Sequence, residues 1–211
     1  WKLFRSYREA ARIIREFAPD VAVGVGGYAS FPVLRQAQRA GIPTVIQEQN
    51  SYAGKSNQIL GRRAARICVA FPGMERFFPK DRILETGNPV RESITAHRSD
   101  PASARAAFGL APGRRTLFAV GGSLGARSIN EALIGGLDEL RAHGIQLLWQ
   151  TGKTSIAHVT AAIHGREDYV KAFAFISDME ASYAAADVVV SRAGSAIAEL
   201  CVAARPVSFV S

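Results

Sequence analysis

Short apolar strands alternate with helix-like segments along the whole chain, and this alternation restricts the fold more than any other feature. The strand-like segments are rich in Val, Ile and Phe and show no apolar–polar alternation of their own. Strands of this kind are typical of a parallel sheet that helices cover on both faces. Repeated strand-then-helix units predict an α/β fold of the doubly wound type.

The sequence indicates two such sheets rather than one. We expect strands at residues 21–25, 44–47, 66–70, 82–85, 116–120, 146–149, 170–175, 187–190 and 207–210. We expect helices at residues 2–17, 31–40, 56–64, 101–108, 126–142, 155–163, 179–186 and 195–203. Residues 92–101 separate the four expected strands up to residue 85 from the five that begin at residue 116. This stretch is polar and non-periodic and ends in Ser99-Asp100-Pro101, a helix-start signal. The predicted domains are therefore residues 1–91 and 92–211, both Rossmann-like. Because the chain starts inside a helix without Met and stops after a strand, we expect both to be incomplete.

Charge and composition narrow the class of partner. The chain has 26 Lys and Arg against 18 Asp and Glu, a net charge of +8, which favours phosphorylated ligands, nucleic acid or an acidic membrane surface. No nucleic-acid-binding motif is found, so nucleic acid is not an expected partner. Cys68 and Cys201 lie in apolar runs without a CxxC pair, which predicts reduced, buried thiols. The histidines lack metal-ligand spacing, so we expect surface residues and no metal site: His97, His143, His158 and His164. No apolar run approaches the roughly 18 residues of a membrane span.

The glycine-rich segment at residues 121–126 is the most informative motif. It follows the strand at 116–120 and precedes a helix. Glycines allow a tight turn and close approach to a ligand, and the helix start adds free N–H groups and a positive dipole end. Ser123 adds a hydroxyl. The segment predicts an anion site suited to a diphosphate, with an unliganded strand–helix turn as the alternative. It is neither a Walker loop nor the GxGxxG of dinucleotide oxidoreductases.

Polar loops follow the other predicted strands as well. A second glycine loop, Gly26-Gly27-Tyr28-Ala29-Ser30, places two hydroxyls after the first strand. Further polar clusters lie at residues 48–50, 87–91, 150–153 and 191–195. Ligands of open α/β sheets bind at the carboxyl ends of the strands, so two such domains predict a ligand cleft.

In their order along the chain, these stretches resemble the MurG family of bacterial glycosyltransferases. The matching stretches include PDVAVGVGGYASFP, GIPTVIQEQN, TGNPVR, GGSLGARSIN, QTGK and ADVVVSRAGSAIAEL. The resemblance implies a GT-B fold, with two Rossmann-like domains facing across a cleft. It implies inverting, metal-independent and cofactor-free transfer of N-acetylglucosamine from UDP-N-acetylglucosamine to lipid I, undecaprenyl-pyrophosphoryl-N-acetylmuramoyl pentapeptide. The product would be lipid II in peptidoglycan synthesis, a reaction of cell-wall biogenesis, cell shape and cell division.

The resemblance also implies roles for single residues. Asn50 would contact the donor sugar, Ser123 the diphosphate, and the backbone of Ile176 the uracil edge. Glu199 would accept hydrogen bonds from the ribose hydroxyls. The remaining donor-side residues are Arg91 at the domain junction and Ser195 and Ala196 beside the sugar and phosphates. The acceptor-side loop would comprise Gly26, Gly27, Tyr28 and Ser30.

Some family features are absent from this sequence. It lacks the family's first glycine loop with its histidine and the glutamine-rich segment after the last strand. Gln47 stands where the family commonly has histidine, and residues 192–199 form a segment one residue shorter than usual. No general base is assigned, so the catalytic residues stay open. The alternatives are another UDP-sugar transferase or epimerase on the same fold, or a non-catalytic nucleotide-sugar-binding module.

The N-terminal helix carries a separate signal. Its spacing puts a basic face, Arg5, Arg8, Arg12 and Arg15, opposite a core stripe of Leu3, Tyr7, Ala10, Ile14 and Phe17. Trp1 and Phe4 fall beside the basic face, where aromatic and basic residues together are typical of a membrane-surface contact. The alternative is a solvated basic face. With the lipid-linked acceptor that the resemblance implies, we expect Trp1, Phe4, Arg5 and Arg8 to contact the anionic cytoplasmic face of the bacterial inner membrane.

Overall fold

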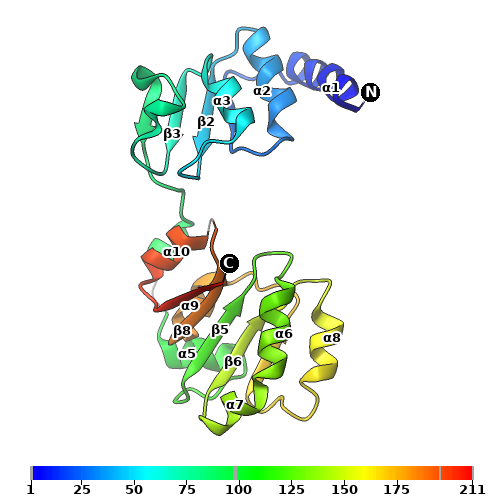
Figure 1. Cartoon of the computed structure of the whole chain (residues 1–211), viewed down its shortest axis with the longest axis vertical. Coiled ribbons are helices and arrows are strands. Elements are labelled where there is room, and N and C mark those ends of the chain that lie inside the picture. The colour runs from blue at the N-terminus through cyan, green and yellow to red at the C-terminus, as the bar shows by residue number, and fades with distance from the viewer. Residues whose placement is uncertain (1, 97–98, 195, 211) are drawn as a thin grey trace. The chain divides into compact units, whose positions relative to one another are not determined.

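The computed structural model describes residues 2–96, 99–194 and 196–210, and it divides the chain into two compact units, Trp1–Pro89 and Val90–Ser211 (Figure 1). The division falls two residues before the one expected from sequence, so Arg91 belongs to the second unit. The reason is a short helix, α4 (Glu92–Ala96), inside the stretch expected to be non-periodic. Its Ile94 is 6% exposed and packs into the core of the second unit.

The first unit is a four-stranded parallel sheet in the order β1-β2-β3-β4. Its strands are β1 (Ala22–Gly24), β2 (Thr44–Glu48), β3 (Arg66–Val69) and β4 (Ile83–Glu85). Its helices are α1 (Lys2–Phe17), α2 (Ser30–Arg39) and α3 (Lys55–Gly61), with 3-10 turns η1 (Met74–Arg76) and η2 (Lys80–Arg82). The parallel α/β arrangement confirms the predicted fold class.

Only one face of this first sheet is well covered, which corrects the expectation of burial on both faces. Leu34 of α2, Leu60 of α3 and Ile67 of β3 share one core cluster. On the opposite face, Val23 is 64% and Leu84 45% exposed. The physical reason is that α2 and α3 cover the same face, whereas α1 packs mainly against α2.

The second unit is a five-stranded parallel sheet in the order β7-β6-β5-β8-β9. Its strands are β5 (Thr116–Val120), β6 (Gln146–Gln150), β7 (Val170–Phe173), β8 (Val188–Arg192) and β9 (Val207–Val210). Besides α4, its helices are α5 (Pro101–Ala107), α6 (Arg127–Gly135), α7 (Leu137–Ala142), α8 (Ile156–Ala162), α9 (Met179–Ala185) and α10 (Ala196–Ala203).

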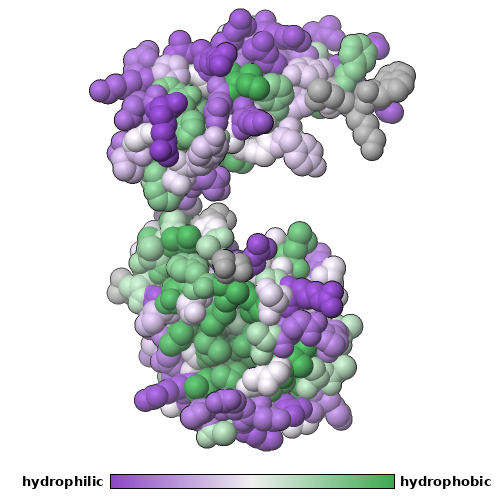
Figure 2. Space-filling model, viewed as in Figure 1, coloured by the Kyte–Doolittle hydropathy of each residue, from purple (hydrophilic) through white to green (hydrophobic). Residues whose placement is uncertain are grey.

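Helices cover both faces of this second sheet, as the sequence predicts. Phe118 and Leu148 belong to a core shared with α5, α9 and α10. Their neighbours Leu147 and Trp149 belong to a second core shared with α6, α7 and α8. Figure 2 shows apolar side chains gathered over the β5, β8 and β9 part of this unit. Because successive side chains of a strand point to opposite faces of the sheet, neighbouring residues of β5 and of β6 contribute to opposite cores.

Three local predictions were wrong. The helix expected at 126–142 is two helices, because Gly135 and Gly136 interrupt it and glycine is a poor helix former. Phe17, expected in the core stripe of α1, is 79% exposed because it lies at the end of that helix, beyond the buried Ala10 and Ile14. The thiols are not buried: Cys201 is exposed, and Cys68 is half-buried on the less covered face of the first sheet.

A buried arginine ties the amino-terminal edge of the second sheet together. The Arg105 guanidinium donates to the carbonyl oxygens of Ala185 and Pro112, at 2.9 and 2.8 Å, and to both carboxylate oxygens of Asp187. One Asp187 oxygen also accepts from the Thr116 N–H at 2.7 Å. Arg105 is 9% exposed, and these partners offset the free-energy cost of burying its charge.

Replacing this arginine tests how much the network contributes. We expect Arg105→Met to lower the free energy of unfolding by about 2–4 kcal/mol, because it leaves two carbonyl oxygens without this donor and removes the cation that pairs with Asp187. Urea denaturation followed by circular dichroism measures this. The matched control is Arg141→Met, whose pair with Asp168 is half exposed and is expected to contribute under about 1 kcal/mol. Equal losses in the two variants would contradict the prediction.

Candidate functional site

A cavity of about 430 Å³ lies at the carboxyl ends of the strands in the second unit. The glycine-rich turn after β5 forms one side, and Gln150 at the end of β6 lies beside it. The predicted donor-side residues that line the cavity are Arg91, Ser123, Ile176, Ala196 and Glu199. They come from segments as far apart as residues 91 and 199, and the fold brings them to one edge of one sheet.

Glycines shape the end of this cavity that lies beside the start of α6. Gly125 has φ +79° and Gly152 has φ +85°, both in the left-handed region. A Cβ added at Gly125 would lie 2.0 Å from the Thr151 carbonyl oxygen, and one at Gly152 would lie 2.1 Å from the Leu124 carbonyl oxygen. The loops after β5 and β6 therefore pack backbone against backbone. This leaves a concave turn directly before α6, with Ser123 exposed on it.

At the other end of the cavity, Ile176 is 5% exposed and its backbone N–H already has a partner. It donates to Gln150 Oε1 at 2.8 Å. Phe175 next to it also lines the cavity and is 55% exposed. Sequence reasoning noted Gln150 only as part of a polar loop and missed Phe175. The position of each at the carboxyl end of a strand was the available signal.

An ion pair closes a third side. The Arg91 Nε donates to Glu199 Oε1 at 2.8 Å and its Nη2 to Oε2 at 2.7 Å, a two-point contact. The Tyr183 hydroxyl donates to the same Oε2 at 3.3 Å. Glu199 hydrogen bonding raises the pKa of Arg91. Burial, reinforced by the Glu199 charge, raises the pKa of Tyr183, so its phenol stays protonated and acts as a donor. Three of the four lone-pair positions of the carboxylate are thus engaged.

The first unit has a separate cavity of about 410 Å³. It is lined by residues 25–28, 48–50 and 54–57, which include Gly26, Gly27, Tyr28 and Asn50. Asn50 therefore lies with the acceptor-side loop, in a different unit from the other described donor-side residues. Tyr28 is 90% exposed. The Ser30 hydroxyl, expected to face a ligand, donates its proton to the carbonyl oxygens of Gly26 and Gly27, at 2.9 and 3.1 Å.

A buried carboxylate organises this first cavity. Glu48 is 3% exposed and accepts from the Asn50 N–H and Nδ2 and from the Gly54 N–H, at 3.0 to 3.1 Å. The buried Asn57 completes the set at 2.9 Å. All acceptor positions of the carboxylate are used by the loop and by Asn57 of α3, so Glu48 holds Asn50 in place. Sequence reasoning named Glu48 within a polar cluster and missed Asn57.

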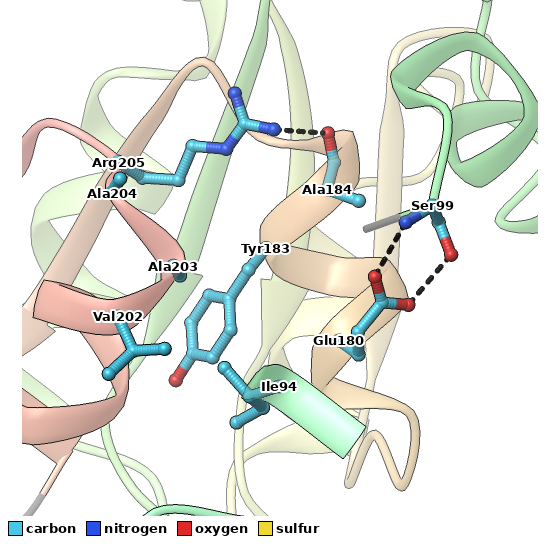
Figure 3. Close-up of a pocket in the computed structure, with 9 residues that line it drawn as sticks. All are labelled: Ile94, Ser99, Glu180, Tyr183, Ala184, Val202, Ala203, Ala204 and Arg205. Carbon is cyan, nitrogen blue, oxygen red and sulfur yellow. Dashed lines mark hydrogen bonds between the residues drawn. The ribbon is translucent and has the colours of Figure 1, made fainter. Parts of the chain in front are cut away.

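A smaller cavity of about 160 Å³ lies on another side of Tyr183, and Figure 3 shows its lining. Glu180 in it accepts from both the N–H and the hydroxyl of Ser99, each at 2.7 Å (Figure 3). Its carboxylate thus fastens α9 to the segment before α5. These contacts account for the Glu180 carboxylate without a ligand.

Two predicted residues, Ser195 and Trp1, lie outside the described residues. Within the described part of the chain, no three His, Cys, Asp or Glu side chains gather as a metal site would require. The side chains of His143, His158 and His164 are 64–92% exposed, as expected of surface residues, and His97 is not described. Among the helices of residues 2–96, 99–194 and 196–210, none has the length and apolar character to cross a membrane.

Comparisons with known proteins and solved structures find similar chains. The chain is similar to the UDP-N-acetylglucosamine–N-acetylmuramyl-(pentapeptide) pyrophosphoryl-undecaprenol N-acetylglucosamine transferase of Phocaeicola vulgatus, with 50% identity over all of this chain and 57% of the relative. It is similar in structure to Acinetobacter baumannii MurG, with a TM-score of 0.67 and 29% identity, covering 99% of this chain and 57% of that one.

A Neisseria meningitidis UDP-GlcNAc 2-epimerase bound to UDP-GlcNAc shares the fold alone, with a TM-score of 0.69 and 12% identity, covering 98% of this chain and 63% of the epimerase. These likenesses bear out the predicted GT-B type of fold. The chain spans just over half the length of the curated relative. The glycosyltransferase family 28 N-terminal domain matches residues 1–69, and the C-terminal domain of the same family matches residues 116–211. The chain therefore belongs to glycosyltransferase family 28.

Proposed function

We propose that this chain carries the nucleotide-sugar site of a transferase that moves N-acetylglucosamine from UDP-N-acetylglucosamine to lipid I, giving lipid II in peptidoglycan synthesis. The observation that carries the proposal is one cavity in the second unit. It combines a glycine-rich turn before a helix, the buried residue Ile176 with its backbone, and a carboxylate, which are suited to bind an anion, a base and a diol. A nucleoside diphosphate sugar needs these three kinds of contact at three separate points.

Each part of the donor has a matching group. The diphosphate lies on the turn at residues 121–125, where the N–H groups at the start of α6 and the Ser123 hydroxyl donate to it. The uracil lies between Phe175 and the backbone of Ile176. The ribose hydroxyls donate to Glu199, since a carboxylate suits a vicinal diol. Ala196, which lines the same cavity, lies at the sugar and phosphates, and the role of Ser195 stays a prediction.

Binding of the ribose would release Arg91. The two ribose hydroxyls need lone pairs of Glu199 that Arg91 now holds. The Arg91 side chain is 50% exposed but Glu199 is only 17% exposed, so parting this pair is unfavourable unless the ribose hydroxyls and Tyr183 compensate. The freed guanidinium can then pair with the diphosphate, where negative charge grows as UDP leaves. Arg91 is thus assigned to leaving-group stabilisation, and no general base is assigned.

The first unit would take the acceptor. Its cavity presents two left-handed glycines, Gly26 and Gly27, and the exposed Lys55 toward an anionic group. The diphosphate of lipid I is such a group. Ser30 shapes this turn through its contacts with the glycine carbonyls. Glu48 holds Asn50 in this same cavity, and the contact of Asn50 with the donor sugar stays a prediction.

Transfer is favoured over epimerisation because the epimerase likeness is one of fold only, at 12% identity. An epimerase would convert UDP-N-acetylglucosamine by itself, whereas a transferase needs the acceptor. A non-catalytic binding module would leave the nucleotide sugar unchanged whether or not the acceptor is present. Incubating the chain with labelled UDP-N-acetylglucosamine, with and without lipid I, therefore separates the three readings.

Glu199 is the first residue to test. We expect Glu199→Gln to weaken UDP-N-acetylglucosamine binding by about 1–3 kcal/mol, because it removes a charged acceptor for the ribose hydroxyls. Isothermal titration calorimetry measures the change. Glu180→Gln is the matched control: Glu180 also accepts two hydrogen bonds in the same unit, yet lies outside the cavity. Unchanged affinity in the Glu199 variant would remove the ribose role.

The basic face of α1 supports peripheral binding to the anionic cytoplasmic face of the inner membrane. Phe4 is 61% exposed, and the Arg8 guanidinium lies 5.9 Å from its ring centroid. Arg5 and Arg8 are exposed. Arg12 on the same face pairs with Glu9 and Glu16, so its charge is partly neutralised. The start of the helix, which carries Phe4, Arg5 and Arg8, is the end expected to meet lipid.

Vesicle binding tests this surface. We expect Phe4→Ala with Arg8→Ala to weaken binding to vesicles of mixed neutral and anionic phospholipid about fivefold or more, at about 1 kcal/mol per arginine near the surface plus the lost ring. Co-sedimentation measures it. Tyr52→Ala with Arg76→Ala removes one aromatic and one cation elsewhere in the same unit. An equal loss there would mean that net charge, not this helix, binds the vesicles.

A further inference from the structure

A buried glutamine joins the two ends of the candidate nucleotide cavity. Gln150 is the last residue of β6 and is 3% exposed. Its Nε2 donates to the Gly122 carbonyl oxygen at 3.0 Å, and its Oε1 accepts from the Ile176 N–H at 2.8 Å. Gly122 follows β5 and Ile176 follows β7, the strands on either side of β6. One side-chain amide therefore bridges the phosphate turn and the base-reading backbone.

This contact decides what Ile176 can offer a base. Its N–H is occupied by Gln150, whereas nothing among the described residues donates to its carbonyl oxygen. An acceptor alone pairs with a base that has a ring N–H, as uracil does at N3. Cytosine has a lone pair at that position and is repelled. The selection thus follows from which backbone group Gln150 leaves free.

We propose that Gln150 is a specificity-determining positioning residue of the nucleotide site. By holding the Ile176 N–H it makes the site select a base with a ring N–H, and by holding Gly122 it fixes the diphosphate turn relative to that base. The inference rests on the proposed function of the cavity. It adds a residue that contacts both recognition elements and acts through them.

The amide is suited to this task because it carries a donor and an acceptor on adjacent atoms without a charge. A carboxylate could still accept from the Ile176 N–H but could not donate to Gly122 when ionised. A thioether could do neither. The Gly122 oxygen also accepts from the Gly125 N–H at 3.1 Å, so the turn keeps one hydrogen bond when the amide is lost. The two replacements therefore separate base selection from diphosphate binding.

Gln146, at the opposite end of the same strand, provides the matched control. It is fully buried, and its amide also bridges backbone groups, accepting from the Ala111 N–H at 2.9 Å and donating to the Ala111 and Arg114 carbonyl oxygens. It does not line the cavity. Gln146→Met therefore removes an equivalent buried amide and its packing without touching either recognition element.

The experiment titrates the full 211-residue chain with UDP, CDP and UMP at mildly alkaline pH, with thermal unfolding as the check on folding. The parent is expected to prefer UDP over CDP. In Gln150→Met the released Ile176 N–H can donate to cytosine N3, so this preference is expected to shrink about tenfold, the effect of roughly one hydrogen bond. Gln150→Glu is expected to keep the preference for UDP over CDP. Its ratio of UDP affinity to UMP affinity is expected to fall about tenfold. Gln146→Met is expected to keep both ratios.

Each contrary outcome has a distinct meaning. A folded parent that does not bind UDP removes the proposed function and this inference with it. A parent that binds UDP and CDP equally leaves the proposed function and overturns the inference. Unchanged ratios in Gln150→Met, or equal changes in Gln146→Met, also overturn it. If Gln150→Met does not fold, Gln150→Glu decides: loss of the UDP-over-CDP preference, or an unchanged UDP-over-UMP ratio, overturns it.

Discussion

The backbone contact between the loops after β5 and β6 is the constraint on which the candidate nucleotide site depends. A Cβ at Gly125 or Gly152 would clash with a carbonyl group of the facing loop, at about 2 Å from its oxygen. The Asn130 amide fixes the same contact by donating to the Thr151 carbonyl at 2.9 Å. This close packing and the Asn130 hydrogen bond hold the turn at 121–125 in position. Gln150 behind it then meets Gly122 and Ile176 at hydrogen-bond distance.

The two cavities are organised by different buried groups, and the chemistry of each group explains the difference. Glu48 only accepts, so it gathers N–H donors from one loop and holds Asn50 among them. Gln150 accepts and donates, so it can join one donor and one acceptor on two different loops. A carboxylate at position 150, beside the Gly122 turn, would also repel a bound diphosphate. A neutral amide bridges the loops without adding that repulsion.

Local signals sufficed for much of the fold because parallel strands end at a common edge. The strand at Thr116–Val120 and the helix Lys2–Phe17 were predicted with the bounds that the structure shows. Pairings between distant segments could not be predicted in this way: Arg91 and Glu199 are 108 positions apart. The exposed Phe17 and the partly open first sheet depend on which helix packs on which face. Periodicity within one segment does not determine that choice.

The residues around Glu199 allow its carboxylate to exchange one partner for another. When Arg91 leaves, a carboxylate that is 17% exposed would lose its main partner, and this would be unfavourable without compensation. Tyr183 provides part of it, since burial and the Glu199 charge both raise the pKa of the phenol and keep its hydroxyl a donor. The Tyr183 ring is fixed against Phe118 at a centroid distance of 5.9 Å, in the core of the sheet. Core packing thus keeps one hydrogen bond to the carboxylate in place while Arg91 and the ribose exchange.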